Sequence, residues 1–205
     1  MMSTAKRLAA LALGLAASLC AAQTPAPAAP TVRLRGIVQS VTPLILTVKA
    51  RGGEVVDLVL PEKLVVSEVY PISLADIQPG SFIGTAALPQ ADGTQRAIAV
   101  TVFPESARGT GEGHRPFDLQ PQSTMTNATV ADVVGTTSGR TLVLKYKDGE
   151  KTLIVPVDAP VVTFRPSDRN LLVPGASVSL SAQVMDGKPT ALRINAGRNG
   201  FPLPY

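Results

Sequence analysis

The 205-residue chain has no tryptophan, one cysteine and one histidine, and its aromatic residues are limited to five phenylalanines and three tyrosines. With a single histidine and no Gly-x-Ser-x-Gly motif, it lacks the usual means of activating a serine or threonine nucleophile. Its candidate carboxylate pairs fall at turns and strand ends, where solvated surface charge is the usual role. These are Asp57, Glu62, Asp76, Asp148 and Asp158. We therefore predict a protein that is not an enzyme.

The scarcity of aromatic side chains also argues against single-strand nucleic-acid binding, which needs exposed rings for stacking and a basic groove. The chain carries 19 basic and 15 acidic residues, a formal net charge of +4. Two of the basic residues, Lys6 and Arg7, belong to an N-terminal segment that export would remove, and their loss lowers the charge to +2. That charge is too small for an electrostatic footprint on a nucleic acid, so we expect no nucleic-acid partner.

No hydrophobic run is long enough to span a membrane. The N-terminal run Leu8–Leu19 has 12 residues, whereas a spanning helix needs about 20. Lys6 and Arg7 precede the run and small residues follow it, which is the pattern of a secretory signal peptide. We predict a signal peptide over residues 1–22 and a periplasmic or secreted protein with no transmembrane segment after cleavage.

The only cysteine, Cys20, lies within this predicted signal peptide. A lipid anchor at Cys20 is disfavoured, because a lipid-modified cysteine normally follows a small residue and Leu19 is large. Cleavage after Ala22 would remove the cysteine, so the exported chain would have no disulfide and would depend on its core for stability. Residues 23–31 are rich in proline and alanine and predict an extended, disordered leader.

An internal repeat organises the remainder of the chain. The first copy runs from Val32 to Phe103 and the second from Ala128 to Ala196. Their landmarks recur in the same order, and the spacing drifts by only two residues across a whole copy. The matching pairs include Gly53-Glu54 with Gly149-Glu150, Val65-Val66 with Val161-Val162, and Asp92-Gly93 with Asp186-Gly187. We predict one domain at 32–103, a second at 128–197 and a C-terminal tail at 198–205.

Each copy consists of short runs in which apolar and polar residues alternate, as in TLVLKYK and SVSLSAQV. A period of two indicates half-buried strands, and the Asp-Gly pairs between runs suit tight hairpin turns. The segments PISLADIQPG and RPSDRNLLVPG end at Pro-Gly and are long enough only for a one- or two-turn helical connector. The sequence predicts an all-β fold of two tandem small five-stranded OB-like barrels, joined by a long ordered connector at 104–127.

This pattern resembles exported bacterial proteins that carry small OB-like domains, often in tandem, and have no assigned function. The resemblance covers both copies and is strongest in LADIQPGSFIG, Leu74 to Gly84, and in the linker from Arg108 to Val130. Relatives with this linker are sometimes labelled metal ABC transporter permeases, a label that requires several spanning helices. The resemblance implies a fold and a compartment, and no activity.

The connector contains the single histidine in the stretch RGTGEGHRPFDLQPQSTMTNATV. Connectors of this length in compact proteins are usually functional or disordered. One interpretation is a site for a divalent metal or copper, with donors from His114, Glu112, Asp118 and Met125. The interpretation that the sequence favours has His114 and Arg115 hydrogen-bonding backbone carbonyls and holding the connector across both barrels. A phosphate-binding role for GTGEG is disfavoured, because no helix follows it.

We predict a non-enzymatic periplasmic binding or scaffold protein of the bacterial envelope, with an envelope protein or a small polar ligand seated between the repeats. The candidate binding residues of the connector are Arg108, Arg115 and Phe117. In the tail, Phe201 and Tyr205 are docking candidates unless the tail folds back as a surface strap. The alternative function is an accessory to metal transport or homeostasis that uses His114. No other cofactor is predicted.

Overall fold

The structure is a computed structural model that describes residues 30–137 and 139–205. The predicted signal peptide, 1–22, and residues 23–29 of the predicted leader lie outside the described residues. The fold is all-β, as the alternating sequence predicts. Within the described ranges, the only helical elements are four three-residue 3₁₀ turns. None of the helices in this part of the chain is long and apolar enough to cross a membrane.

Thirteen strands follow one another along the described chain, and each copy of the repeat supplies six strands rather than five. The first copy comprises β1 (Val32–Val41), β2 (Ile45–Ala50), β3 (Val55–Val59), β4 (Val65–Pro71), β5 (Phe82–Pro89) and β6 (Gln95–Val102). The second comprises β8 (Thr124–Thr136), β9 (Gly139–Tyr146), β10 (Gly149–Pro156), β11 (Val161–Ser167), β12 (Ser177–Met185) and β13 (Lys188–Gly197). The connector supplies β7 (Gly113–Pro116), and the 3₁₀ turns are η1 (Leu74–Asp76), η2 (Glu105–Ala107), η3 (Arg169–Leu171) and η4 (Arg198–Gly200).

The short connectors and the Asp-Gly turn at Asp186 are confirmed, whereas at the Asp148-Gly149 pair the turn residues are Lys147 and Asp148 and Gly149 begins β10. Asp186 and Gly187 form the two-residue turn between β12 and β13 with φ values of 51° and 73°, and positive φ at both positions is what a type I′ hairpin requires. The two segments that end at Pro-Gly contain η1 and η3. Ser73 caps η1, because its hydroxyl accepts a hydrogen bond from the Ala75 N–H.

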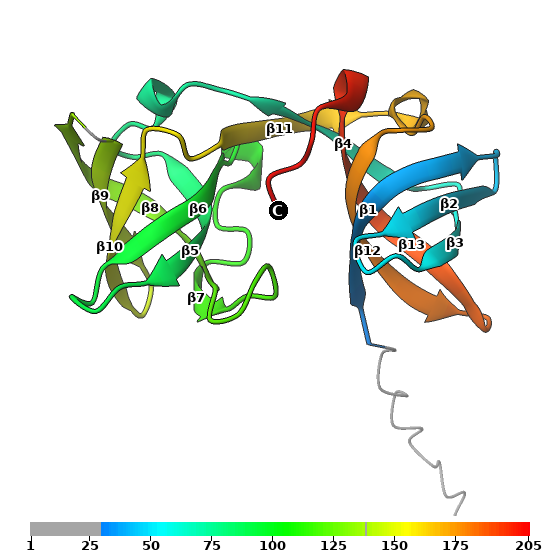
Figure 1. The fold of residues 1–205 in the computed structure, drawn as a ribbon, viewed down its shortest axis with the longest axis horizontal. Helices are drawn as coiled ribbons and strands as arrows, with labels where there is room; N and C mark the ends of the chain where they lie inside the picture. Colours follow the sequence, from blue (N-terminus) through cyan, green and yellow to red (C-terminus); the bar gives the residue numbers. More distant parts are fainter. Residues whose placement is uncertain (1–29, 138) are drawn as a thin grey trace, which may run out of the picture.

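The two copies exchange strands. β1, β2 and β3 of the first copy form a ring with β12 and β13 of the second, in which β3 meets β13 at Val59 and Thr190; these five strands are the first lobe. β8, β9 and β10 join β5 and β6 of the first copy, and the β10–β6 pairing closes a five-stranded barrel, the second lobe. Figure 1 shows the lobes side by side, with β4 and β11 between them.

The prediction of two tandem barrels, each closed by its own copy of the repeat, is therefore not confirmed. Neither range 32–103 nor range 128–197 contains all five strands of one lobe. The additional strand of each copy, β4 or β11, crosses between the lobes, so the last two strands of each copy complete the lobe that the other copy begins. This is the geometry of domain swapping within one chain. Alternation cannot reveal it, because the same strand faces are buried in either arrangement.

The connector also differs from the prediction. β7 pairs with the beginning of β8, from Gly113 opposite Asn127 to Pro116 opposite Thr124. The first strand of the second copy therefore begins at Thr124 instead of Ala128. The hairpin escaped sequence analysis because the stretch is rich in glycine, proline and polar residues and lacks the alternation that marks the other strands.

Each lobe has its own hydrophobic core. Leu46, Leu58 and Ile194 are among the fully buried residues of the first lobe, and Ile83, Leu142 and Leu153 are among those of the second. A third, smaller cluster lies where β4 and β11 meet the C-terminal tail. It contains Val69, Val162 and Leu203, with Phe164, Phe201 and Tyr205 packed against them. The junction between the lobes is therefore packed with apolar side chains.

The tail folds back onto the molecule, and Figure 1 shows it entering the space between the lobes. Leu203 is only 4% exposed, and its N–H donates to the Ser177 hydroxyl at 3.1 Å. The Arg51 guanidinium donates to the Leu203 and Tyr205 main-chain oxygens at 3.4 Å. The tail is thus part of the junction rather than only a strap on the surface.

β4 and β11 form an antiparallel ladder from Val66 opposite Ser167 to Pro71 opposite Val162. At its centre Glu68, 4% exposed, accepts hydrogen bonds from Arg198 at 2.8 and 2.9 Å and from Arg165 at 3.1 and 3.2 Å. The hydrogen bonds from Arg198 and Arg165 outweigh burial and lower the pKa of Glu68 from 4.5 to about 2. The carboxylate therefore stays ionised at neutral pH.

We expect Glu68→Gln to lower the free energy of unfolding by about 2 kcal/mol at neutral pH, because it removes one member of a buried charge cluster whose arginines remain partly solvated. Since the pKa of Glu68 is lowered by folding, its contribution is complete above about pH 4.5 and is lost as the pH falls toward about 2. Urea denaturation followed by circular dichroism would measure the difference between variant and wild type, which should shrink through that window.

Glu62→Gln is the matched control, because Glu62 is exposed in the turn between β3 and β4. Equal destabilisation by the two substitutions, or a Glu68→Gln effect that does not change with pH, would contradict this account of the ladder.

Candidate functional site

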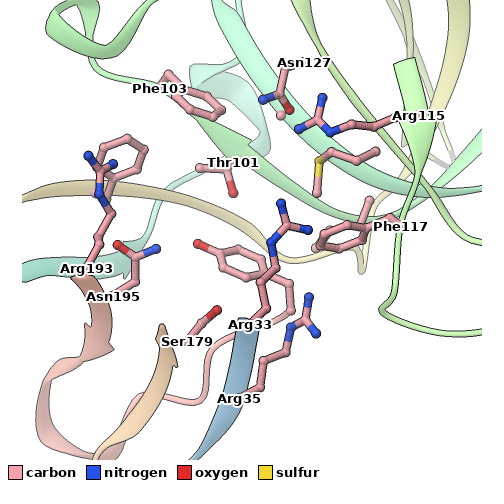
Figure 2. Close-up of a pocket in the computed structure, with 16 residues that line it drawn as sticks. Arg33, Arg35, Thr101, Phe103, Arg115, Phe117, Asn127, Ser179, Arg193 and Asn195 are labelled. Atoms are coloured by element: carbon pink, nitrogen blue, oxygen red, sulfur yellow. The ribbon is translucent and has the colours of Figure 1, made fainter. Parts of the chain in front are cut away.

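A cleft of about 250 Å³ lies between the two lobes. It is lined from the first lobe by Arg33, Arg35, Ser179, Arg193 and Asn195, and from the second by Gly84, Ala86, Ala99, Thr101, Met125 and Asn127. The remaining lining residues are Phe103 directly after β6, Arg115 of β7, Phe117 of the connector, Phe164 of β11 and Tyr205 of the tail. Figure 2 shows these side chains converging on a common space.

Strand alternation explains how the residues reach the cleft. Arg193 and Asn195 are two positions apart on β13 and both line the cleft, while Ile194 between them is fully buried in the first core. On β6, Ala99 and Thr101 line the cleft, and Val100 between them is fully buried in the second core. Successive side chains of a strand point to opposite faces, so the outer face of each lobe forms one wall of the cleft.

The cleft is strongly basic. Arg33, Arg35, Arg115 and Arg193 line it, and no aspartate or glutamate does. Arg115 donates to the Gly111 carbonyl oxygen at 2.7 Å, and among the described residues neither Arg115 nor Arg193 forms an ion pair. Burial, followed by the neighbouring charge of Arg33, lowers the pKa of Arg115. The cleft therefore holds two arginines, Arg115 and Arg193, that have no carboxylate partner among the described residues.

The loop that follows β7 within the connector contacts the first lobe through its side chains. The Arg35 guanidinium donates to both carboxylate oxygens of Asp118, at 2.8 and 3.2 Å, and Arg33 lies 3.9 Å from the same carboxylate. The Phe117 ring lies 5.2 Å from Arg35 and 5.6 Å from Arg33, within cation–π range. The hydrogen bond from Arg35 lowers the pKa of Asp118. These contacts orient both arginines at the edge of the cleft, where a second cavity of about 490 Å³ adjoins it.

Two buried polar atoms that belong to cleft residues have no hydrogen-bond partner in the protein, Asn127 Oδ1 and Arg35 Nε. Asn127 is 5% exposed, and its Nδ2 donates to the Thr110 carbonyl oxygen at 2.8 Å, which fixes the orientation of the amide. Its Oδ1 is directed at Gly84, the residue opposite Asn127 in the β5–β8 ladder. Because an unpaired buried polar group is costly, these atoms mark the wall as a place for a polar ligand group.

The structure does not bring the predicted metal donors together. The register of β7 and β8 pairs His114 with Thr126 and Arg115 with Met125, so His114 lies on the opposite strand face from the cleft residue Met125. Among the described residues, no group of three or more histidine, cysteine, aspartate or glutamate side chains could hold a metal ion.

The individual donors have other partners. His114 Nδ1 lies 2.8 Å from the Thr126 hydroxyl, and Glu112 accepts a hydrogen bond from the Lys147 N–H at 3.0 Å. Burial, followed by the charges of Lys151 and Arg115, lowers the pKa of His114 and favours its neutral form. The favoured alternative had both side chains bond backbone carbonyls and hold the connector across the two barrels. Arg115 does bond a carbonyl, but Gly111 belongs to the connector itself, and His114 bonds a hydroxyl.

Of the three predicted connector binding residues, Arg115 and Phe117 line the cleft. Arg108 does not, because it pairs with Glu105 at 2.6 Å and donates to the Gly80 carbonyl oxygen at 2.9 Å. Sequence analysis missed Arg33, Arg35 and Arg193. They were visible only as the polar members of alternating strands, a position that most surface residues share.

Tyr205 was a predicted docking candidate, and it lines the cleft. Burial raises the pKa of its phenol, and a hydrogen bond with Thr101 opposes this effect. The tail thereby connects with a cleft strand of the second lobe.

No family model, curated protein or solved structure matches this chain. The resemblance to exported tandem OB-like proteins therefore stays a prediction.

We expect Gly84→Ala to distort the cleft wall and to lower the free energy of unfolding by about 1 to 3 kcal/mol. A Cβ at Gly84 would lie 2.8 Å from Asn127 Oδ1 and 2.8 Å from the Phe103 ring, so both side chains would have to move. Urea denaturation monitored by circular dichroism measures the loss.

The control is Gly135→Ala, at an exposed β8 position where a Cβ would meet nothing within 4 Å. It should change stability by no more than about 0.5 kcal/mol. A Gly84→Ala variant as stable as this control would show that the wall is not tightly packed.

Proposed function

We propose that this protein is a non-enzymatic binding protein of the bacterial envelope that holds a small anionic ligand in the cleft between its lobes. The observation that carries the proposal is the cleft lining, which contains four arginines and no aspartate or glutamate. Guanidinium groups are planar forks of donors that match carboxylate and phosphate oxygens. Arg33 and Arg35 share Asp118, whereas Arg115 and Arg193 have no carboxylate partner among the described residues, so an anion is the ligand that gains most beside them.

The size of the cleft favours a small ligand over a protein partner. A volume of about 250 Å³ is close to the lower end of typical small-molecule sites, and the walls come from both lobes and the connector. Some arginines outside the cleft pair with carboxylates: Arg108 pairs with Glu105, and both Arg165 and Arg198 pair with Glu68. Among the described residues Arg115 and Arg193 form no such pair, and both line the same cleft.

The envelope location is supported by the N-terminal pattern of Lys6, Arg7 and the apolar run that follows. We also propose that each lobe is an OB-like barrel, assembled from three strands of one copy and two of the other. Its support is the small five-stranded ring in each lobe together with the short 3₁₀ connectors. A metal-handling role has less support, because the predicted donors do not converge.

The proposal predicts saturable binding of small anions that depends on the cleft arginines. Calorimetric titration of the purified protein at low salt with benzoate, citrate and inorganic phosphate should detect binding of at least one of them. Arg115→Ala and Arg193→Ala should each weaken that binding by about tenfold or more, the worth of one charge-assisted hydrogen bond.

Arg96→Ala is the matched control, because Arg96 is exposed on β6 and lines neither cavity. Absence of binding for all three anions, or equal weakening by Arg96→Ala, would overturn the proposal. A parallel binding assay with an oligonucleotide should show no tight, salt-sensitive binding. Such binding would identify a nucleic acid, instead of a small anion, as the ligand of the cleft.

A further inference from the structure

We propose that the ligand of this cleft is an aromatic oxyanion that also carries a hydroxyl group. This inference rests on the proposed function and specifies its ligand class. It combines three observations about the cleft: the aromatic surface, the distribution of the arginines and the unpartnered acceptor of Asn127.

The aromatic surface calls for a ligand with an apolar, flat body. Phe103, Phe117, Phe164 and Tyr205 all line the cleft, and they are half of the aromatic residues of the chain. All four are half-buried. A bare inorganic anion would leave this surface in contact with water, whereas a ring could cover it in offset-stacked or edge-to-face contacts.

These rings are held in place before any ligand arrives. Phe103 packs edge to face against both Phe82 and Phe164, each at a centroid distance of 5.4 Å. Ala86 and Ala99 also line the cleft, and their small side chains leave room beside the rings. The wall is therefore a preformed slot, and binding would not require the aromatic side chains to become ordered.

The arginines define where the anionic group would bind. Figure 2 shows Arg115 and Phe117 on one side of the cleft and Arg193 on the other, with Thr101 between them. Arg33 and Arg35 are already engaged with Asp118, whereas Arg115 donates to the Gly111 carbonyl and has no carboxylate partner among the described residues. The oxyanion, a carboxylate or a phosphate monoester, would therefore bind first at Arg115 or Arg193, where it would meet an uncompensated charge.

The side-chain oxygen of Asn127 requires a hydrogen-bond donor, which a bare anion does not have. Asn127 Oδ1 has no partner in the protein, and the bond from Nδ2 to the Thr110 carbonyl holds the amide in its orientation. A carboxylate or phosphate cannot donate to this oxygen, but a hydroxyl on the ring can. A site with a buried unpaired polar atom discriminates strongly in favour of the ligand that satisfies it.

The test is a calorimetric comparison of matched probes against the purified full-length protein. Cyclohexanecarboxylate differs from benzoate in having no flat aromatic ring. The hydroxybenzoate isomers add a hydroxyl donor to benzoate, and phenyl phosphate carries a phosphate in place of the carboxylate. We expect at least one hydroxybenzoate to bind about tenfold tighter than benzoate, and benzoate to bind tighter than cyclohexanecarboxylate and inorganic phosphate. The comparison with phenyl phosphate decides which oxyanion the arginines prefer.

Asn127→Leu should remove the preference for hydroxybenzoate over benzoate, so that the ratio of the two affinities falls to about one, because the acceptor that distinguishes the two probes is gone. If that variant does not fold, the ratio of hydroxybenzoate to benzoate affinity in the wild-type protein decides the matter alone. Equal affinities for those two probes, or tighter binding of citrate or phosphate than of any aromatic probe, would overturn this inference while the proposed anion site stands. Failure of every anion to bind would overturn both.

Discussion

The antiparallel ladder between β4 and β11 is the constraint on which the rest of the structure depends. It carries each copy of the repeat from one lobe to the other, so neither lobe has its five strands without it. At its centre the buried Glu68 bonds Arg165 across the ladder and Arg198 after β13. A buried carboxylate needs such partners to remain charged, and these partners come from elements that meet only when both lobes are assembled.

The cleft is a consequence of this exchange. Because β5 and β6 complete one lobe and β12 and β13 complete the other, equivalent late strands of the two copies form facing walls. The walls are not chemically equivalent: β13 contributes Arg193 and Asn195, whereas β6 contributes Ala99 and Thr101. β13 thus supplies charge and β6 supplies space, while β1 of the first copy adds Arg33 and Arg35 and the connector adds Arg115 and Phe117. A duplicated fold has in this way acquired a single asymmetric site.

Individual residues show how far prediction from sequence could go. Arg115 and Phe117 were found because the connector is unusual in length and composition, and both line the cleft. Met125 was grouped with His114 as a metal donor, but strand pairing puts the two on opposite faces. Their separation of eleven positions in the sequence says nothing about faces unless the register is known. Arg33, Arg35 and Arg193 carry no local signal, because an arginine on the polar face of a strand is ordinary.

The sequence by itself determined the all-β class, most of the strands and the duplication, because each of these follows from local periodicity or from the recurrence of landmarks in order. Which strands close each lobe was decided only by the tertiary structure, since exchanged and unexchanged pairings bury the same alternate residues. The same is true of the cleft. Its arginines come from three strands that are distant in sequence, and only the ladder between the lobes brings their charges together around one space.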